Sequence, residues 1–272
     1  TSVGGREGEA GGQPAGGLPT IAGIHLRRQS GRCAPKAGTG RVHRKTPPRR
    51  RDGAGGFPPD ANVLRWSRHS VRIGLFMAQF MSLGDAVAAL VRDGDTVAVE
   101  GFTHLIPHAA AHEVIRQGRR DLTLVRMTPD IVYDQMIGMG CAAKLVFSWG
   151  GNPGVGSLHR FRDAVQNGWP RPLAIEEHAH AAMANAYAAG AAGLPFAVFR
   201  GYLGVDLPAV NPNIRRVTCP FTGEALAAVP ALRPDVAIVH ALKADRAGNV
   251  LIEGILGVQK EVVLAAARAL VT

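Results

Sequence analysis

The chain has 272 residues and a net charge of +10, and this charge is confined to its first part. Residues 1–76 contain 14 Lys and Arg against 4 Asp and Glu, whereas the remainder contains 17 residues of each sign. A basic surface for nucleic acid is therefore not expected from residue 77 onward. No apolar stretch has the length of a membrane-spanning helix, so no such helix is expected.

Residues 1–76 also hold 15 Gly and 7 Pro and show no helical or strand periodicity. Such a segment buries too little apolar surface to offset its chain entropy, so we expect it to be disordered. The chain begins with Thr1, and Met77 and Met81 stand just before the first helix signal, which favours mistranslated upstream sequence. The alternatives are a solvated tail, or a basic run that binds RNA or a membrane surface.

The three cysteines, Cys33, Cys141 and Cys219, form no CxxC pair and are odd in number. This pattern favours reduced thiols and predicts a cytoplasmic protein.

From residue 77 onward, short apolar runs alternate with helical patterns. Ser82 and Asp85 form a capping box for the first helix, which ends before Gly94, and Ser157 is expected to cap a later one. The predicted strands are 95–100, 122–127, 144–149, 172–176, 196–200, 215–221, 235–242 and 268–272. The other predicted helices are 107–118, 130–138, 157–168, 179–190, 224–232 and 260–267.

This alternation predicts an α/β fold of three layers, with a mainly parallel sheet flanked by helices. Residues 77–272 are long enough for one substantial core, so we expect a single domain there. Ligands bind at the carboxyl ends of such strands. The loops of interest follow Val99, Met127, Trp149, Ile175, Phe199 and His240.

A glycine-rich turn follows the third of these strands. Its backbone N–H groups and the helix behind it suit an anion, although a tight structural turn explains it as well. It matches neither the dinucleotide fingerprint nor a Walker loop. The candidate ligand-binding residues are Gly150, Gly151, Asn152, Gly154, Gly156 and Ser157.

Glu100 ends the first strand and precedes Gly101, Phe102 and Thr103. A carboxylate at this position could be a nucleophile or a base, or it could position a substrate or a water. The alternative is a solvated loop residue or a helix cap.

A second acidic cluster contains Glu176, Glu177, His178 and His180. Carboxylates with imidazoles could perform acid–base chemistry, but Glu residues at a helix start also favour the helix dipole. Neither this cluster nor the other histidines have clear metal-ligand spacing, so no metal site is expected.

Three stretches in the same order resemble the alpha subunits of family I CoA-transferases. The run 93–107 is similar to the alpha-subunit signature, although Glu100 replaces its first glycine. Residues 181–196 resemble the active-site helix and glycine turn, which adds Gly190 and Gly193 to the candidate substrate-binding residues. Residues 233–249 are similar to a late strand and turn, and SWGGNPGVGSL is closest to the glutaconate CoA-transferase branch.

The resemblance implies a partner, the homologous beta subunit, whose Glu attacks the thioester and becomes a glutamyl-CoA thioester. Acyl-CoA and a carboxylic acid are then the substrates, no cofactor is permanently bound, and the loop at 150–156 borders the CoA ester. The family continues beyond Thr272, so the domain is expected to be truncated at its C-terminus. A CoA-thioester or ring-opening hydrolase, and a non-catalytic sensing or assembly module, stay open as alternatives.

Overall fold

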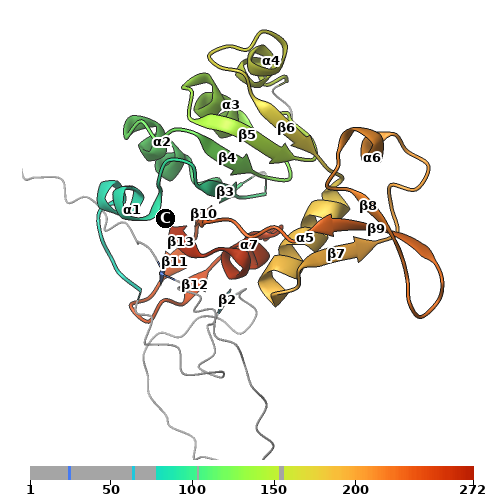
Figure 1. Ribbon diagram of the computed structural model, residues 1–272. Helices are drawn as coiled ribbons and strands as arrows, with labels where there is room; N and C mark the ends of the chain where they lie inside the picture. Colours follow the sequence, from blue (N-terminus) through green and yellow to red (C-terminus); the bar gives the residue numbers. More distant parts are fainter. Residues whose placement is uncertain (1–23, 26–62, 65–77, 103, 153–155) are drawn as a thin grey trace, which may run out of the picture.

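The computed structural model describes residues 24–25, 63–64, 78–102, 104–152 and 156–272 (Figure 1). Most of the segment 1–76 lies outside the described residues, so the structure does not test the prediction that this segment is disordered. Its described residues are two short strands, β1 (Ile24–His25) and β2 (Val63–Leu64).

A seven-stranded sheet forms the centre of the fold, in the order β1-β13-β10-β3-β4-β5-β6. Only β1 pairs antiparallel, with β13, and every other neighbouring pair is parallel. The predicted mainly parallel sheet is therefore confirmed. Besides β1, the strands of this sheet are β3 (Thr96–Glu100), β4 (Leu122–Val125), β5 (Ala142–Phe147), β6 (Ala174–Glu177), β10 (Val236–Val239) and β13 (Arg268–Val271).

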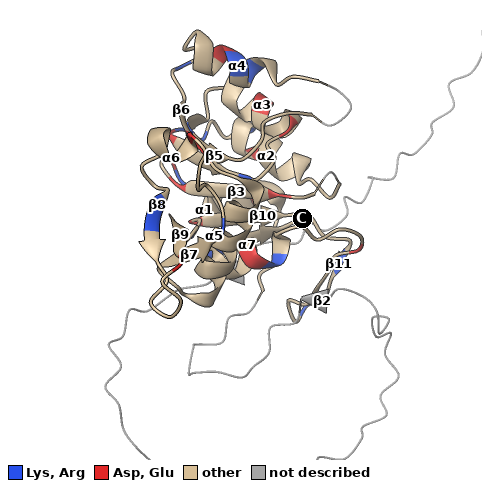
Figure 2. Ribbon diagram, turned by 90° about the vertical axis from the view of Figure 1, so that its right-hand side faces the viewer, with Lys and Arg blue, Asp and Glu red and all other residues tan. Residues whose placement is uncertain are grey.

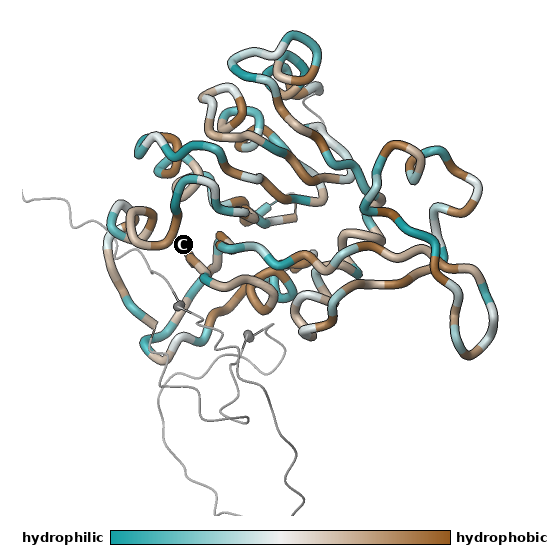
Figure 3. Tube along the Cα trace, in the orientation of Figure 1, coloured by the Kyte–Doolittle hydropathy of each residue, from teal (hydrophilic) through white to brown (hydrophobic). Residues whose placement is uncertain are grey.

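Helices cover both faces of this sheet, which gives the expected three layers (Figure 1; Figure 3). In β3, Val97 and Val99 pack into the cluster under the first helix layer, whereas Ala98 packs into the cluster on the opposite face. The first layer contains α1 (Leu83–Leu90), α2 (His108–Arg116), α3 (Ile131–Gly138) and α4 (His159–Gln166). The opposite layer contains α5 (His180–Ala192) and α7 (Gln259–Ala265).

A separate antiparallel sheet packs against α5 and corrects one prediction. It consists of β7 (Phe196–Phe199), β9 (Ala225–Pro230) and β8 (Arg215–Thr218), with β9 in the centre. The prediction of a helix over residues 224–232 was wrong, because this segment contains the strand β9. The backbone of β9 pairs with β7 on one edge and with β8 on the other, and these backbone hydrogen bonds outweigh the local helix propensity.

The remaining short elements lie between these units. Helix α6 spans Leu207–Val210, and strands β11 (Lys243–Ala244) and β12 (Val250–Leu251) form a small sheet with β2. The predicted strand at 196–200 is therefore present as β7, but it lies outside the parallel sheet.

The helix caps confirm one prediction and correct another. Ser82 Oγ accepts a hydrogen bond from the backbone N–H of Asp85 at 3.1 Å, as the capping box predicts. At α4 the N-cap is Leu158, whose side chain makes no capping bond, and Ser157 Oγ instead accepts from Arg162 at 3.3 Å. The predicted cap at Ser157 was wrong because the helix begins one residue later than expected.

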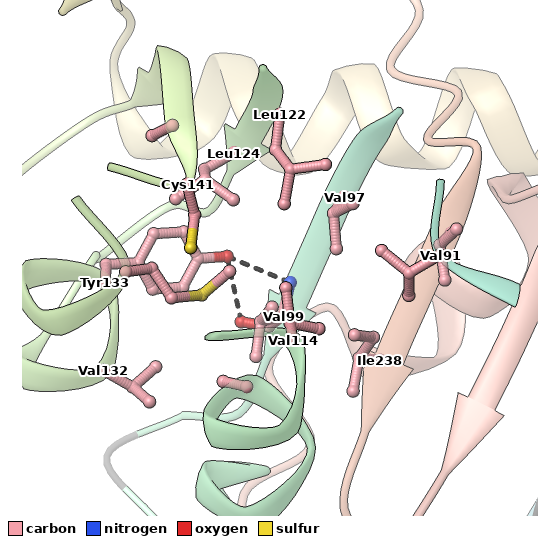
Figure 4. Close-up of a cluster of buried hydrophobic side chains, with 14 of the residues drawn as sticks. Val91, Val97, Val99, Val114, Leu122, Leu124, Val132, Tyr133, Cys141 and Ile238 are labelled. Carbon is pink, nitrogen blue, oxygen red and sulfur yellow. Dashed lines mark hydrogen bonds between the residues drawn. The ribbon is translucent and has the colours of Figure 1, made fainter. Parts of the chain in front are cut away.

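Tyr133 connects the carboxyl ends of β3 and β4, and Figure 4 shows its hydroxyl hydrogen bonded to the backbone of Val99 in β3. Its buried hydroxyl accepts from the N–H of Val99 at 2.9 Å and donates to the carbonyl oxygen of Val125 at 2.8 Å. The last register pair of the two strands is Ala98 with Val125, so the hydroxyl continues the connection beyond the ladder. It thereby fixes the backbone immediately before Glu100.

Lys, Arg, Asp and Glu are distributed over several elements, with both signs on α4 and on α7 (Figure 2). Within the described residues, no helix combines the length and the apolar character needed to cross a bilayer.

Candidate active site

A cavity of about 330 Å³ opens at the carboxyl ends of β3 and β4. β3 is the strand where the chain order of the sheet reverses, because β4 lies on one side of it and the later β10 on the other. Ligands of open α/β sheets bind at such positions. The lining residues are Glu100, Gly101, Phe102, Arg126, Met127, Thr128, Asp130, His180, Leu256, Gly257 and Val258.

Glu100 lies in this cavity, as its position at the end of a strand predicted. Only 4% of the residue is exposed, and its Oε1 accepts a hydrogen bond from the hydroxyl of Tyr187 at 3.1 Å. The backbones of Gly101 and Met127 also hydrogen bond to the carboxyl. Glu100 is therefore neither a solvated loop residue nor a helix cap, but a fixed group in the wall of the cavity.

Burial raises the pKa of Glu100 to about 7 from the usual 4.5, because the charged form loses its hydration. The Arg126 charge and the hydrogen bonds from Tyr187 and the backbone oppose this rise without cancelling it. The carboxyl group consequently exchanges its proton near neutral pH, where an acid–base or charge-switching group is useful.

Arg126 and Asp130 form a buried ion pair beside Glu100. Arg126 Nη1 lies 2.9 Å from Asp130 Oδ2, and its Nη2 donates to the carbonyl oxygen of Gly101 at 2.6 Å. Asp130 is the N-cap of α3, and its Oδ1 accepts from the N–H of Val132 at 3.1 Å. The helix N-terminus and Arg126 together stabilise the Asp130 carboxylate.

His180 and Thr128 form a second polar part of the wall. Ser148 Oγ donates to the carbonyl oxygen of Met127 at 2.7 Å, so the His180 Nδ1 atom 2.7 Å from Ser148 Oγ must be the donor. His180 Nε2 lies 2.9 Å from Thr128 Oγ1 and accepts from it when the ring is neutral. This chain of bonds fixes the orientation of the imidazole at the cavity.

We expect Glu100 to make the protein less stable as the pH rises from about 4.5 to about 7. Over this range the unfolded chain releases the Glu100 proton while the folded chain retains it, so the free energy of unfolding falls with pH. The shift corresponds to roughly 3 kcal/mol. Urea unfolding at several pH values should show this decline in the wild type and a flatter profile in Glu100→Gln. The control Glu253→Gln, at an exposed loop carboxyl, should keep the wild-type slope; equal slopes in all three proteins would contradict the assignment.

The residues after Glu100 reach the cavity too. Gly101 lies where a Cβ atom would come within 2.6 Å of the carbonyl oxygen of Leu105, so the backbone turns very closely there. Phe102 lines the cavity and is 42% exposed, and its side chain lies close to the backbone of Gly257. The predicted residues Thr103 and Gly154 lie outside the described residues.

The described residues of the glycine-rich turn lie beside the cavity and are not among its lining residues. The N–H of Gly151 donates at 3.2 Å to the carbonyl oxygen of Pro129, which stands between two lining residues. Asn152 and Gly156 bridge each other through two backbone bonds of 3.1 Å, and Gly156 has a φ of 110°, which favours glycine. Gly150 packs on the ring of Phe161. A ligand contact of this turn and of Ser157 stays a prediction.

Glu176 and His178 lie apart from the main cavity. Glu176 Oε1 bonds the Nε2 of His178 at 2.8 Å, and its Oε2 bonds Nζ of Lys144 at 2.5 Å. The His178 bond and Lys144 lower the pKa of Glu176 to about 2, although burial acts against them. Both residues line a smaller cavity of about 30 Å³ beside α5, so their position gives no support to a shared site with Glu100.

Gly190 and Gly193 have structural roles in α5. A Cβ atom on Gly190 would overlap the carbonyl oxygen of Leu232, so the glycine allows close packing. Gly193 is the C-cap, with a left-handed φ of 77°. Neither lines the cavity, and a substrate contact at these positions stays a prediction.

The sequence did not identify most of the wall. Arg126 and Asp130 follow the apolar strand β4, and this position at a strand end was the available signal. Leu256, Gly257 and Val258 precede α7 and carry no pattern that distinguishes them from an ordinary turn. Within the described residues, no group of three or more His, Cys, Asp or Glu could hold a metal ion.

Comparisons with known proteins identify the family. The coenzyme A transferase profile matches residues 80–272. Over 196 residues the chain is 69% identical to the A subunit of the 3-oxoadipate CoA-transferase of Pseudomonas knackmussii, covering 72% of this chain and 70% of that protein.

Solved structures agree with this match. The glutaconate CoA-transferase of Acidaminococcus fermentans is 32% identical with a TM-score of 0.63, covering 68% of this chain and 63% of that one. A variant of the decarboxylase AibA/AibB also has 32% identity and a TM-score of 0.63, covering 70% of this chain and 71% of that one. The expected resemblance and fold are confirmed, and the 69% relative favours a transferase over the hydrolase and non-catalytic alternatives. The chain belongs to the coenzyme A transferase family.

Proposed function

We propose that this chain is the alpha subunit of an enzyme that moves CoA between an acyl-CoA and a carboxylic acid, with a 3-oxo dicarboxylic acid as the substrate class. The identity of 69% to the corresponding chain of a 3-oxoadipate CoA-transferase carries this proposal. The cavity supports it, because its wall combines charged groups with the side chains of Phe102, Leu256 and Val258, which provide apolar surface for a methylene chain.

The nucleophile is a Glu of the homologous beta subunit. Its carboxylate attacks the thioester carbonyl and expels CoA as a thiolate, leaving a mixed anhydride. The thiolate then attacks the glutamyl carbonyl, which releases the first acid as its carboxylate and leaves a glutamyl-CoA thioester. The acceptor carboxylate repeats these two steps in reverse, so no water or net proton is consumed.

This chain binds and orients the acyl part of the substrate. Glu100 positions the substrate from the cavity wall, with Gly101 and Phe102 beside it, and a substrate contact of Thr103 stays a prediction from the sequence. The turn at 150–157 borders the CoA portion, since Gly151 is bonded to the segment that lines the cavity. No cofactor is permanently bound: CoA enters and leaves as a substrate.

We further place the protein in the cytoplasm, with residues 77–272 as the CoA-transferase unit. The free thiols of Cys141 and Cys219 suit a reducing compartment.

Co-expression with the beta subunit tests the proposal. The purified complex should transfer CoA from a panel of acyl-CoA donors to carboxylic acid acceptors, and the chain alone should not. Peptide mass spectrometry of the complex incubated with acyl-CoA should place the CoA adduct on a Glu of the partner. An adduct on Glu100, or release of free CoA without need of an acceptor, would contradict it and favour a hydrolase.

A further inference from the structure

Three charged side chains line one cavity, and all three are almost completely buried. Glu100, Arg126 and Asp130 are 4%, 2% and 5% exposed. Charged groups are seldom buried to this degree without a partner for each charge. One cation here faces two carboxyl groups, so the charges do not balance when both carboxyl groups are ionised.

Asp130 is the natural partner of Arg126. It lies 2.9 Å from the guanidinium and also caps α3, so two sources of positive potential stabilise its charge. Among the described residues, the hydrogen-bond donors to Glu100 are neutral, namely the Tyr187 hydroxyl at 3.1 Å and backbone N–H groups. Glu100 is therefore the carboxyl group that can lose its charge at least cost.

Arg126 keeps donors available for a ligand. A guanidinium carries five N–H groups. In the part of the chain that the structure describes, its side-chain contacts are one carbonyl oxygen, Gly101, and one carboxylate, Asp130, with the ring of Tyr133 at 5.6 Å. A cationic group with free donors, in the wall of a cavity that also has apolar lining, suits the anionic end of an otherwise apolar chain.

We propose that Arg126 binds the far carboxylate of a dicarboxylic acyl group in this cavity, and that Glu100 takes up a proton from solvent when that carboxylate enters. This inference rests on the proposed function and assigns its selectivity to two residues. The protonated Glu100 carries no charge, and its O–H group donates a hydrogen bond to the entering carboxylate. Asp130, Arg126, Glu100 and the ligand then carry one net negative charge in place of two.

The titratable groups around Glu100 come from four elements. They are Arg126 after β4, Asp130 and Tyr133 at α3, His180 and Tyr187 on α5, and His104 in the loop after β3. Burial gives Glu100 a pKa of about 7, whereas it raises the pKa of both tyrosines well above 10, so neither tyrosine changes charge near neutrality.

Calorimetry on the complex with the beta subunit tests this pairing. The probes are free adipate and free hexanoate, which have the same chain length and differ in the far carboxylate. Titrations in two buffers of different ionisation enthalpy count the protons taken up. At pH 8.5 adipate should bind with nearly one proton more than hexanoate. Between pH 7 and 8.5 its affinity relative to that of hexanoate should fall by about 16-fold in total, with a slope that approaches tenfold per pH unit at the upper end.

Variants separate the two roles. Glu100→Gln should abolish the extra proton and the extra pH slope, and Arg126→Lys should weaken adipate more than hexanoate. Tyr187→Phe removes a bond to the ionised carboxyl and should move the fall in adipate affinity to higher pH. The control Glu253→Gln should behave as the wild type.

Equal proton counts and slopes for the two acids in the wild type would overturn the proposal, as would an unchanged difference in Glu100→Gln. A complex that transfers CoA without this difference would retain the proposed function and lose only the selectivity mechanism. Proton-linked adipate binding in a complex that does not transfer CoA would support the roles of Arg126 and Glu100 and contradict the proposed function.

Discussion

Replacing Arg126 by methionine is expected to lower the free energy of unfolding by about 3–5 kcal/mol at pH 8. The change removes the only cation close to Asp130 and Glu100 among the residues described at this cavity, and both carboxyl groups remain buried. Since whole domains are stable by about 5–15 kcal/mol, this loss would be a large fraction of the total. Urea unfolding followed by circular dichroism measures it.

The Arg126→Met deficit should be smaller at pH 6, because protonation of Glu100 relieves part of the uncompensated charge. The charge of Arg126 lowers the pKa of Glu100, so its removal raises that pKa further. Arg126→Lys keeps the positive charge and should retain more stability than the methionine variant. Equal stability of the wild type and Arg126→Met at pH 8 would show that the ion pair contributes nothing to the fold.

Gly190→Ala is expected to destabilise the protein by about 3 kcal/mol, near the upper end of the usual cost of overpacking. The new methyl group would overlap the carbonyl oxygen of Leu232 and approach Ala265 Cβ to 3.1 Å. The carbonyl belongs to the backbone, so α5 must move away from the segment before β10 and from α7. Local helix propensity acts in the opposite direction, favouring alanine by about 1 kcal/mol.

Gly84→Ala is the matched control, because Gly84 is also helical and a Cβ atom there would have no neighbour closer than 3.5 Å. Thermal and urea unfolding should leave this variant close to the wild type. If both variants were equally stable, close packing at Gly190 would not be the reason for the glycine.

The sequence alone determined the fold class and the position of Glu100. Apolar runs such as Thr96–Glu100 predict buried parallel strands because they lack the alternation of a half-exposed sheet. A charged residue at the end of such a run must face the crevice, since no apolar layer can cover it without a partner. The cap at Ser82 was equally predictable, because a capping box requires only residues three apart.

One local signal was misleading, and others did not reveal the tertiary contacts of their residues. Residues 225–230 are rich in alanine and form a strand, because β7 and β8 provide backbone partners that no local pattern reveals. Glu176 and His178 form a cluster in sequence, yet Lys144 from the neighbouring strand pairs with Glu176 beside a different cavity. At Gly190 the structure shows close packing on Leu232, and a substrate contact there stays a prediction.

The composition of the cavity was decided by the tertiary structure alone. Tyr187 reaches Glu100 across 87 positions of sequence, and the segment before α7 closes the wall from near the end of the chain. A sequence pattern records periodicity and short spacings, whereas the ionisation of Glu100 depends on burial and on the charges of distant segments. The sequence therefore determined that a carboxyl group stands at the end of β3, and only the packing of α3, α5 and the segment before α7 around it decided its pKa.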